Sequence, residues 1–470
     1  MPYVYYVVAI DGSGNEGAPT PTAKVTLTAA TMGSEEIVFD ANSDYCGFLD
    51  VPDTPAHAFE DRNGDIQLFS VFPSYTDAGY SAYKGVFRMI GDSFAVKTSA
   101  NPTGLHRDCP DPVLKPTPDT QWNPGEVLYG KEWVSGPYRI DDGNAADPDK
   151  VYTLIHTEIE KPDGCTENCV SYFAITAALA KDDLGALTSN GDGIYLHDNL
   201  SNNWQVARPP YDPSPETPSG YDGPSNIIRG DDGAYYAFIK ALPDPQGVSS
   251  QKGGACLIRK QDLTDNNEMW KAWNGNGFNH ILDGSKTCEP SLSVELNGSS
   301  GTLTGIQTIL KTTTVSLPTY LAVGDYGQFV DLNEDGVIDT PADDGSPGGG
   351  DVTGESAPDR LFNGVYYRGL NTLSSSAVSP AGPPRLIGNF AKFFYSQSVP
   401  PGVTLLNGDN NPAIAYPSVI DHNSSSINFE TTDDSAYLYF TRQDLDDNGD
   451  PIIPKVLKRA QIQFIAPGAY

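Results

Sequence analysis

Carboxylate side chains stand just before a proline at three widely spaced points of the chain. These are Asp53 in Asp53-Thr54-Pro55, Asp222 in Asp222-Gly223-Pro224 and Glu289 in Glu289-Pro290. Carboxylates that face each other in a partly closed pocket push their pKa values apart, which leaves one acid and one base at neutral pH. Such a pair meets the requirement for cleaving a glycosidic bond. Any one of them alone is also explained as a loop cap or as the partner of a nearby Arg or Lys.

The three motifs belong to a repeat with five copies. In each copy a residue pair precedes a proline and an alternating run, and a turn and a second apolar strand follow. The prolines are Pro55, Pro137, Pro224, Pro290 and Pro417, and the second strands cover residues 65–70, 151–156, 234–240, 303–311 and 436–442. A repeat of β-meanders at this spacing is typical of a propeller. The sequence therefore predicts an all-β fold, a five-bladed β-propeller.

Composition and charge agree with this fold and exclude some partners. The chain has 47 glycines and 38 prolines in 470 residues, and no apolar run is long enough to cross a bilayer. With 61 acidic against 29 basic residues, the formal net charge is −32. We expect no nucleic-acid binding, because a strongly acidic surface repels polyanions. We also expect no membrane insertion, because the sequence has no apolar run of the required length.

A propeller gathers side chains from every blade at one rim. The innermost strand of each blade begins at one face of the ring and the second strand returns to it, so strand starts and strand ends converge there. Period-two alternation places further side chains on the same side. The predicted substrate contacts, which would hold sugar hydroxyls or a substrate carboxylate, are His57, His156, Glu158, Tyr221 and Arg442.

These motifs resemble those of the five-bladed propeller glycoside hydrolases that include arabinanases, xylosidases and arabinofuranosidases. In that family the first blade opens with an Asp-Pro-type motif that carries the base or nucleophile, and Asp53-Thr54-Pro55 resembles it. A later blade opens with Glu-Gly-Pro, which carries the acid, and Asp222-Gly223-Pro224 is similar to it but has Asp in place of Glu. The resemblance implies that Asp53 is the base and that Asp222 or Glu289 is the acid. Blade two lacks the family's carboxylate at its strand start, and Glu158 would stand in for it.

Two segments lie outside this repeat. Residues 1–30 resemble the last hairpin of a fibronectin type III domain, which implies a fragment of a longer modular extracellular protein. Residues 31–470 form the predicted propeller, in which residues near 35–40 read as a strand that closes the ring. The long interval before Pro417 predicts an insertion at about 325–385 between blades four and five.

The predicted insertion contains a segment that resembles calcium loops of EF-hands and of dockerin or thrombospondin repeats. Oxygen ligands at alternate positions suit a hard cation, and Gly336 allows the sharp turn. The segment implies a structural calcium ion bound by Asp331, Asn333, Asp335, the Val337 carbonyl and Asp339. It departs from the pattern at the twelfth position, which is Ala342, although Asp343 follows. An acidic solvated turn is the alternative.

The six cysteines favour disulfides in a secreted or cell-surface protein. Cys165 and Cys169 could close a small loop, and the other four, Cys46, Cys109, Cys256 and Cys288, could pair in an undetermined order. Paired C-x-x-C motifs and a nearby histidine cluster, which a zinc site would need, are missing.

The function that these patterns favour is a secreted glycoside hydrolase that uses paired carboxylates in the central pocket, with a polysaccharide or oligosaccharide as substrate. A non-catalytic carbohydrate-binding or adhesive propeller is the second interpretation. A polysaccharide lyase that uses Tyr, His and Arg chemistry on uronic acids is the third.

Overall fold

The computed structural model describes residues 2–3, 25–26, 30–40, 49–50, 52–75, 86–108, 113, 132–141, 150–160, 170–180, 205–210, 220–242, 244, 249–296, 299–330, 360–373, 385–389, 413–443 and 455–465. Every regular element in these ranges is a β-strand. No helix in this part of the chain is long and apolar enough to cross a membrane.

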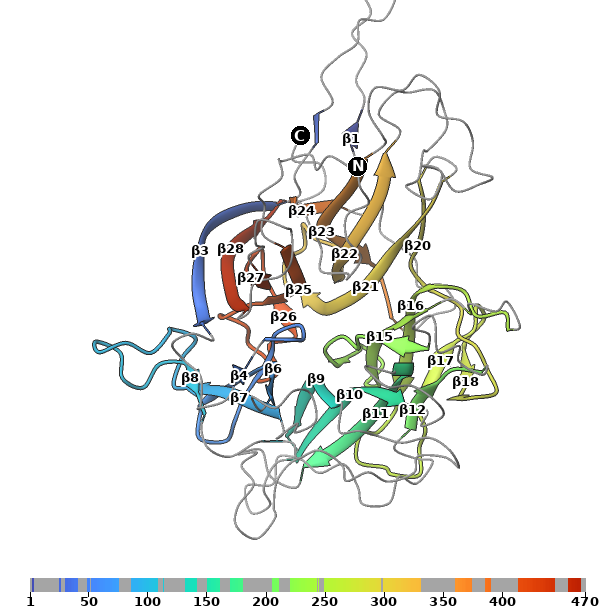
Figure 1. Cartoon of the computed structure of the whole chain (residues 1–470), viewed down its shortest axis with the longest axis horizontal. Coiled ribbons are helices and arrows are strands. Elements are labelled where there is room, and N and C mark those ends of the chain that lie inside the picture. The colour runs from blue at the N-terminus through green and yellow to red at the C-terminus, as the bar shows by residue number, and fades with distance from the viewer. Residues whose placement is uncertain are drawn as a thin grey trace, which may run out of the picture.

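Five sheets stand around a ring, which confirms the predicted five-bladed propeller (Figure 1). The first sheet contains β4 (Leu49–Asp50), β5 (His57–Glu60), β6 (Ile66–Tyr75), β7 (Val86–Gly91) and β8 (His106–Arg107). The second contains β9 (Glu132–Ile140), β10 (Lys150–Glu160), β11 (Val170–Ala180), β12 (Gln205–Arg208) and β19 (Leu282–Asp283). The third contains β13 (Tyr221–Asp222), β14 (Ile228–Arg229), β15 (Tyr235–Ala241), β16 (Gly254–Lys260), β17 (Lys271–Trp273) and β18 (Phe278–His280).

The other two sheets complete the ring. The fourth contains β20 (Ser293–Leu296), β21 (Ser299–Thr312), β22 (Tyr320–Val330), β23 (Arg360–Leu370), β24 (Arg385–Asn389) and β26 (Thr431–Thr432). The fifth contains β25 (Ala413–Ile420), β27 (Ser435–Gln443), β28 (Val456–Phe464) and β3 (Ala30–Asp40). The predicted ring-closing strand is confirmed. Strand β3, near the start of the chain, pairs in antiparallel register with β28, near its end.

The core lies between the sheets rather than at the centre of the ring. Each of the five gaps between neighbouring sheets holds one cluster of buried apolar side chains. Strand β15 is apolar on both faces because it packs against two neighbouring sheets. Ala237 and Ile239 pack toward the second sheet, whereas Tyr236 and Phe238 pack toward the fourth. Successive side chains of a strand point to opposite faces, so a sheet covered on both sides needs apolar residues at every position.

One end of the ring is closed by the turn between β25 and β27, which we call the plug (residues 421–434). Three plug residues, Ile427, Asn428 and Glu430, bond to the ends of the innermost strands of the other four sheets at Glu60, Arg139, Arg229 and Lys311. All five innermost strands therefore end at the plug. Their first residues lie at the opposite end of the ring, which we call the strand-start end.

The innermost strand of the fourth sheet differs from the one that the repeat predicts. It is β21, because Asn226 of the third sheet bonds the Ile309 backbone N and O at 2.6 and 2.8 Å, and Thr308 Oγ1 accepts from Val419 N of the fifth sheet at 3.1 Å. The prediction that Glu289-Pro290 opens this strand is therefore wrong. The segment 303–311, which the repeat predicts as the second strand of the fourth sheet, belongs to its innermost strand, β21.

The insertion was predicted at about 325–385, between blades four and five. This range contains the end of β22, all of β23 and the first residue of β24, which are strands of the fourth sheet itself. The proposed calcium loop at 331–343 lies outside the described residues. So do residues 4–24, which include most of the fibronectin-like segment; its ends form a short antiparallel pair between β1 (Pro2–Tyr3) and β2 (Val25–Thr26).

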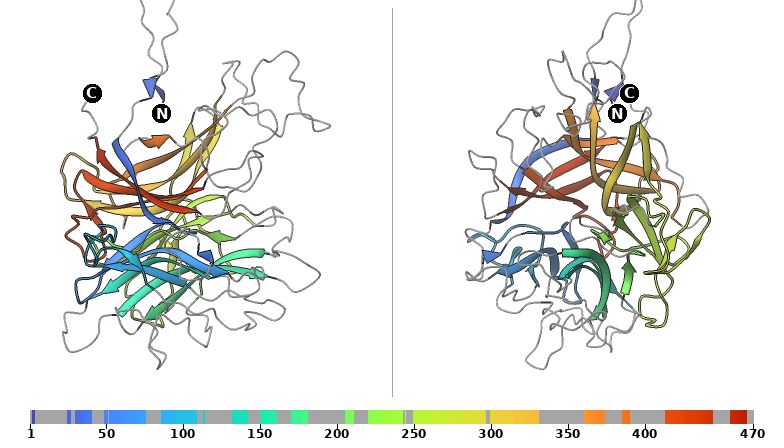
Figure 2. Two further views of the ribbon diagram at one scale, coloured as in Figure 1. Left: turned by 60° about the vertical axis from the view of Figure 1, so that its left-hand side comes forward. Right: turned by 45° about the vertical axis from the view of Figure 1, so that its right-hand side comes forward.

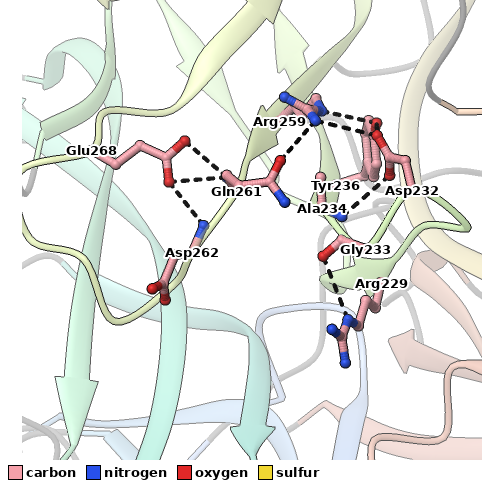
Figure 3. A network of polar contacts seen from close by, with 9 residues as sticks. All are labelled: Arg229, Asp232, Gly233, Ala234, Tyr236, Arg259, Gln261, Asp262 and Glu268. Atoms are coloured by element: carbon pink, nitrogen blue, oxygen red, sulfur yellow. Dashed lines mark hydrogen bonds and ion pairs between the residues drawn. The ribbon is translucent and has the colours of Figure 1, made fainter.

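The third sheet has a polar network at the end near the plug (Figure 3). Asp232 accepts hydrogen bonds from Tyr236 OH at 2.8 Å and from Arg259 at 3.2 Å, and it also bonds the Ala234 backbone N. The turn at residues 230–234, which carries this network, is therefore remote from the strand-start end. Figure 2 gives two further views of the ring, in which strands β15 and β16 of the third sheet pack against β21 of the fourth.

Candidate active site

Asp222 begins the innermost strand of the third sheet and meets His156 of the second sheet. His156 Nδ1 lies 3.0 Å from Asp222 Oδ1, and its Nε2 lies 3.9 Å from Glu158 Oε1. Their side chains are 14–20 % exposed, so the cluster is sheltered but reachable from solvent. The structure thus brings together three residues that the sequence predicted for the site.

The backbones of the second and third sheets approach closely at Gly220, beside Asp222. Gly220 forms a parallel bridge with Phe173 of β11, and a Cβ built on Gly220 would lie 2.1 Å from the Phe173 carbonyl oxygen. Its φ of +105° is also one that glycine adopts readily. Glycine at position 220 therefore allows Tyr221 and Asp222 to lie directly against the second sheet.

Burial and charge act in opposite directions on this cluster. Burial disfavours the imidazolium form of His156, but Asp222 and then Glu158 outweigh burial and raise the pKa of His156 to about 10. Burial likewise disfavours the Asp222 carboxylate. His156, Lys240 and the Gly223 N–H outweigh it and hold the pKa of Asp222 well below its usual range. Asp222 and His156 are therefore a charged pair at neutral pH.

Aromatic rings enclose the imidazole. The centroids of Trp133 and Phe173 lie 5.3 and 5.1 Å from that of His156. The rings exclude water from its faces and leave the nitrogen atoms for the two carboxylates. Trp133 is 7 % exposed, so it belongs to the interblade core.

Asp53 forms a second cluster at the junction of the first and fifth sheets. Lys455 Nζ lies 2.6 Å from Asp53 Oδ1, and Tyr416 OH donates to the same oxygen at 3.3 Å. The Lys455 ammonium also lies 5.8 Å from the centroid of the Tyr416 ring. The backbone N of Asp53 donates to Ser70 O of the neighbouring strand, which fixes the start of the inner strand.

Both clusters lie at the strand-start end, because Asp53 and Asp222 precede innermost strands that run toward the plug. Their sheets are the first and the third, which are not neighbours but flank the second. The two carboxylates therefore belong to different sheets at the strand-start end, which we also call the mouth of the ring, and His156 and Glu158 belong to the sheet between them.

Glu289 lies elsewhere. Its backbone N donates to Trp273 O and Ser291 N donates to Ala255 O, so the segment follows the outer edge of β16. A disulfide between Cys256 and Cys288, with Cα atoms 6.1 Å apart, fastens it there. The Glu289 carboxylate bonds Lys252 Nζ at 2.8 Å and is 44 % exposed. With strands spaced about 4.8 Å apart, this edge is about 14 Å from the innermost strand of its sheet.

The remaining predicted substrate contacts are separated by the fold. Tyr221 is fully buried and donates to Gln251 Oε1 at 2.8 Å. His57 is 4 % exposed, and burial lowers its pKa to about 3. Arg442 pairs with Glu35 on β3 at 3.5 Å. Sugar contacts by Tyr221 and His57 are not supported, because neither side chain reaches solvent.

Sequence reasoning missed Lys455 and Gly220. Lys455 lies 402 positions from Asp53 and belongs to no repeated motif, so no local signal marks their pairing. Gly220 precedes the Tyr221-Asp222-Gly223 stretch and is visible only as one glycine among many.

The predicted calcium ligands Asp331, Asn333, Asp335, Val337 and Asp339 all lie outside the described residues. Within the part of the chain that is described, no group of three or more His, Cys, Asp or Glu side chains is arranged to hold a metal ion.

Comparison with known proteins finds distant structural matches. No family model matches the sequence, and no curated protein matches it. Solved structures with similar folds include the GH93 α-L-arabinofuranosidase of Fusarium graminearum with arabinobiose (12 % identity, 92 % of this chain and 98 % of that chain, TM-score 0.40). The GH43_1 enzyme of Xanthomonas citri with xylotriose is similar at 11 % identity (91 % and 90 %, TM-score 0.34). The Bombyx mori GH32 β-fructofuranosidase is similar at 10 % (87 % and 60 %, TM-score 0.35).

Proposed function

We propose that this protein is a glycoside hydrolase whose active site is the strand-start end of the propeller. The observation that carries the proposal is that Asp53 and Asp222, from non-adjacent sheets, both begin innermost strands at this end and both contact a cationic side chain. Glycoside cleavage needs two carboxyl groups that flank the scissile bond. The similar structures include an α-L-arabinofuranosidase, an enzyme in complex with xylotriose and a β-fructofuranosidase, which is consistent with a sugar substrate.

In this proposal Asp53 acts as base or nucleophile. Either it takes a proton from a water whose oxygen bonds to the anomeric carbon, or its own oxygen bonds to that carbon, and in both cases the bond from the carbon to the leaving oxygen breaks. In the second case water then hydrolyses the bond between the sugar and Asp53, which restores the carboxylate. Lys455 and Tyr416 hold its carboxylate in place.

The leaving oxygen needs a proton, and the Asp222–His156 pair is the proposed source. Asp222 alone is a poor donor, since its pKa is held low by His156. The imidazolium carries the proton, and Glu158 beside Nε2 supports its charge. A proton passed from His156 through Asp222 to the departing oxygen leaves neutral imidazole, which regains a proton from solvent.

The test is a panel of arabinan, xylan, fructan and other plant, algal and microbial polysaccharides, assayed for released reducing ends and for unsaturated products. The proposal expects new reducing ends from the wild type and at least a hundredfold fewer from Asp53→Asn, in a protein that stays folded. Unsaturated products would instead indicate a lyase. No product from any member of the panel would reject the hydrolase.

One observation favours a second candidate, a carbohydrate-binding propeller without catalysis. Both carboxylates are already engaged in ion pairs, which serves stability as well as chemistry. In that case the wild type binds glycans without cleaving them, and Asp53→Asn weakens binding itself.

We further propose that the protein is secreted or displayed at the cell surface, as one part of a longer modular protein. The Cys256–Cys288 disulfide supports an oxidising compartment. Secretion signals fused to the chain, followed by thiol labelling of the product, test whether this pair is oxidised in the mature protein.

A further inference from the structure

Tyr416 has a backbone conformation that side chains rarely adopt. Its φ is +56°, and it precedes Pro417 in the middle of the innermost strand β25. Crowding between Cβ and the backbone disfavours this left-handed region for every L-residue, whereas glycine enters it freely. In the described part of the chain, Phe429 is the other non-glycine residue with a positive φ.

The corresponding positions of two other sheets are glycines. Gly136 has a φ of +61° before Pro137, and Gly223 has a φ of +48° before Pro224. In the second and fifth sheets the pairing register shifts at this point. In these three sheets the residue before the proline is left-handed, and in two of them it is glycine; Thr54, before Pro55 of the first sheet, is not among the residues with a positive φ. The backbone alone does not explain a tyrosine at 416.

The Tyr416 side chain explains it. Its hydroxyl donates to Asp53 Oδ1 at 3.3 Å, across the junction between the fifth and first sheets. Lys455, also from the fifth sheet, contacts the same oxygen at 2.6 Å and lies over the Tyr416 ring. Two groups from one sheet thus hold a single carboxylate of its neighbour. Strain of this kind persists where the surroundings impose it, and it clusters at functional sites.

We propose that Tyr416 is a positioning residue for Asp53. The unfavourable backbone is retained because the phenol fixes the direction in which the carboxylate faces the mouth of the ring. This inference rests on the proposed hydrolase function. It adds a second group of the fifth sheet, beside Lys455, to the surroundings of Asp53.

The experiment uses three substitutions of the full chain. Tyr416→Phe removes the hydroxyl but keeps the ring and the backbone. Tyr416→Ala and Tyr416→Gly both remove the ring, and only the glycine variant relieves the backbone. Gly223→Ala is the matched control for strain, because its Cβ would enter open space at a similar φ. Thermal midpoints, kcat and KM are measured for each on the polysaccharide that the wild type cleaves.

We expect Tyr416→Phe to keep the wild-type thermal midpoint and to lower kcat roughly tenfold, with KM changed less than about twofold. Tyr416→Gly should melt about 1–2 °C above Tyr416→Ala, and Gly223→Ala should melt below the wild type by a similar amount. Both ring-deleted variants should lose as much kcat as Tyr416→Phe, or more.

Two results would overturn the proposal while the hydrolase function stands. One is an active wild type whose kcat survives Tyr416→Phe and Tyr416→Gly. The other is a loss confined to variants that also melt early, which would make Tyr416 a stability residue. A wild type that cleaves nothing rejects the hydrolase function and this role together. In that event, the Gly-against-Ala difference at position 416 still measures the strain.

Discussion

Two aspartates begin innermost strands at the same end of the ring, yet their surroundings differ. Asp222 is paired with an imidazole from the second strand of the adjoining sheet, and aromatic rings enclose that imidazole. Asp53 is paired with an ammonium group and a phenol, both from the sheet that the N-terminal strand β3 closes. The imidazole of His156 lies between two carboxylates, Asp222 and Glu158, whereas Lys455 and Tyr416 both contact one oxygen of Asp53. In the proposed function the first cluster handles the proton of the leaving oxygen and the second holds the carboxylate of Asp53 in position.

The largest expected effect comes from removing either carboxylate. Asp53→Asn and Asp222→Asn should each lower kcat by about 10²–10⁴-fold, because each removes a group that handles a proton or attacks in the transition state. Steady-state kinetics on the substrate found in the panel would measure this, with circular dichroism as the folding control. If one variant keeps full activity, the two clusters do not share a reaction.

The pH dependence of stability should distinguish the clusters next. The pKa of His156 in the folded protein, about 10, is above its ordinary 6.5, so its stabilising contribution is complete below pH 6.5 and disappears as the pH rises toward 10. The pKa of Asp222 is lowered, so its contribution is complete above about pH 4 and is lost as the pH falls. The pair should therefore stabilise the fold most between about pH 4 and 6.5.

Replacing His156 by Gln should flatten the decline in unfolding free energy between pH 6.5 and 10, which for one proton has a slope of at most about 1.4 kcal/mol per pH unit. Urea unfolding at a series of pH values measures it. Lys455→Met is the matched variant from the other cluster and should leave the slope in this window unchanged. Equal slopes in wild type and His156→Gln would contradict the ion pair.

Calcium provides a smaller effect that is independent of both clusters. If Asp331, Asn333, Asp335 and Asp339 bind the ion, chelation should lower the thermal midpoint, since an ion at a hundred times its Kd contributes about 2.7 kcal/mol. Differential scanning calorimetry with and without chelator measures the shift, and Asp335→Asn should reduce it. A midpoint insensitive to chelator would leave this segment as an acidic turn.

The smallest effect is expected at Glu289. Its carboxylate is partly exposed, pairs with an exposed lysine and lies at the outer edge of the third sheet. Glu289→Gln should change kcat less than about twofold and the unfolding free energy by less than about 0.5 kcal/mol, as is usual for surface ion pairs. A large loss of kcat would place Glu289 in the active site and contradict the roles proposed for Asp53 and Asp222.

The sequence by itself determined the architecture. Repeated proline-led strands followed by strands such as Tyr235–Ala241, apolar on both faces, predict sheets covered on both sides, and a ring of blades is the arrangement that covers them. The sequence also predicted that Asp53, Asp222 and His156 lie at the strand-start end, because strand starts and strand ends follow from local pattern.

Tertiary structure alone decided which of these side chains meet. Glu289-Pro290 has the same local pattern as Asp222-Gly-Pro224, but β21 takes the innermost place and the Cys256–Cys288 disulfide holds Glu289 at an edge. Lys455 reaches Asp53 only because β3 closes the ring and joins the last sheet to the first. Contacts between residues some 400 positions apart depend on closure of the whole ring, and no local propensity encodes them. The strain at Tyr416 likewise becomes visible only in the folded backbone.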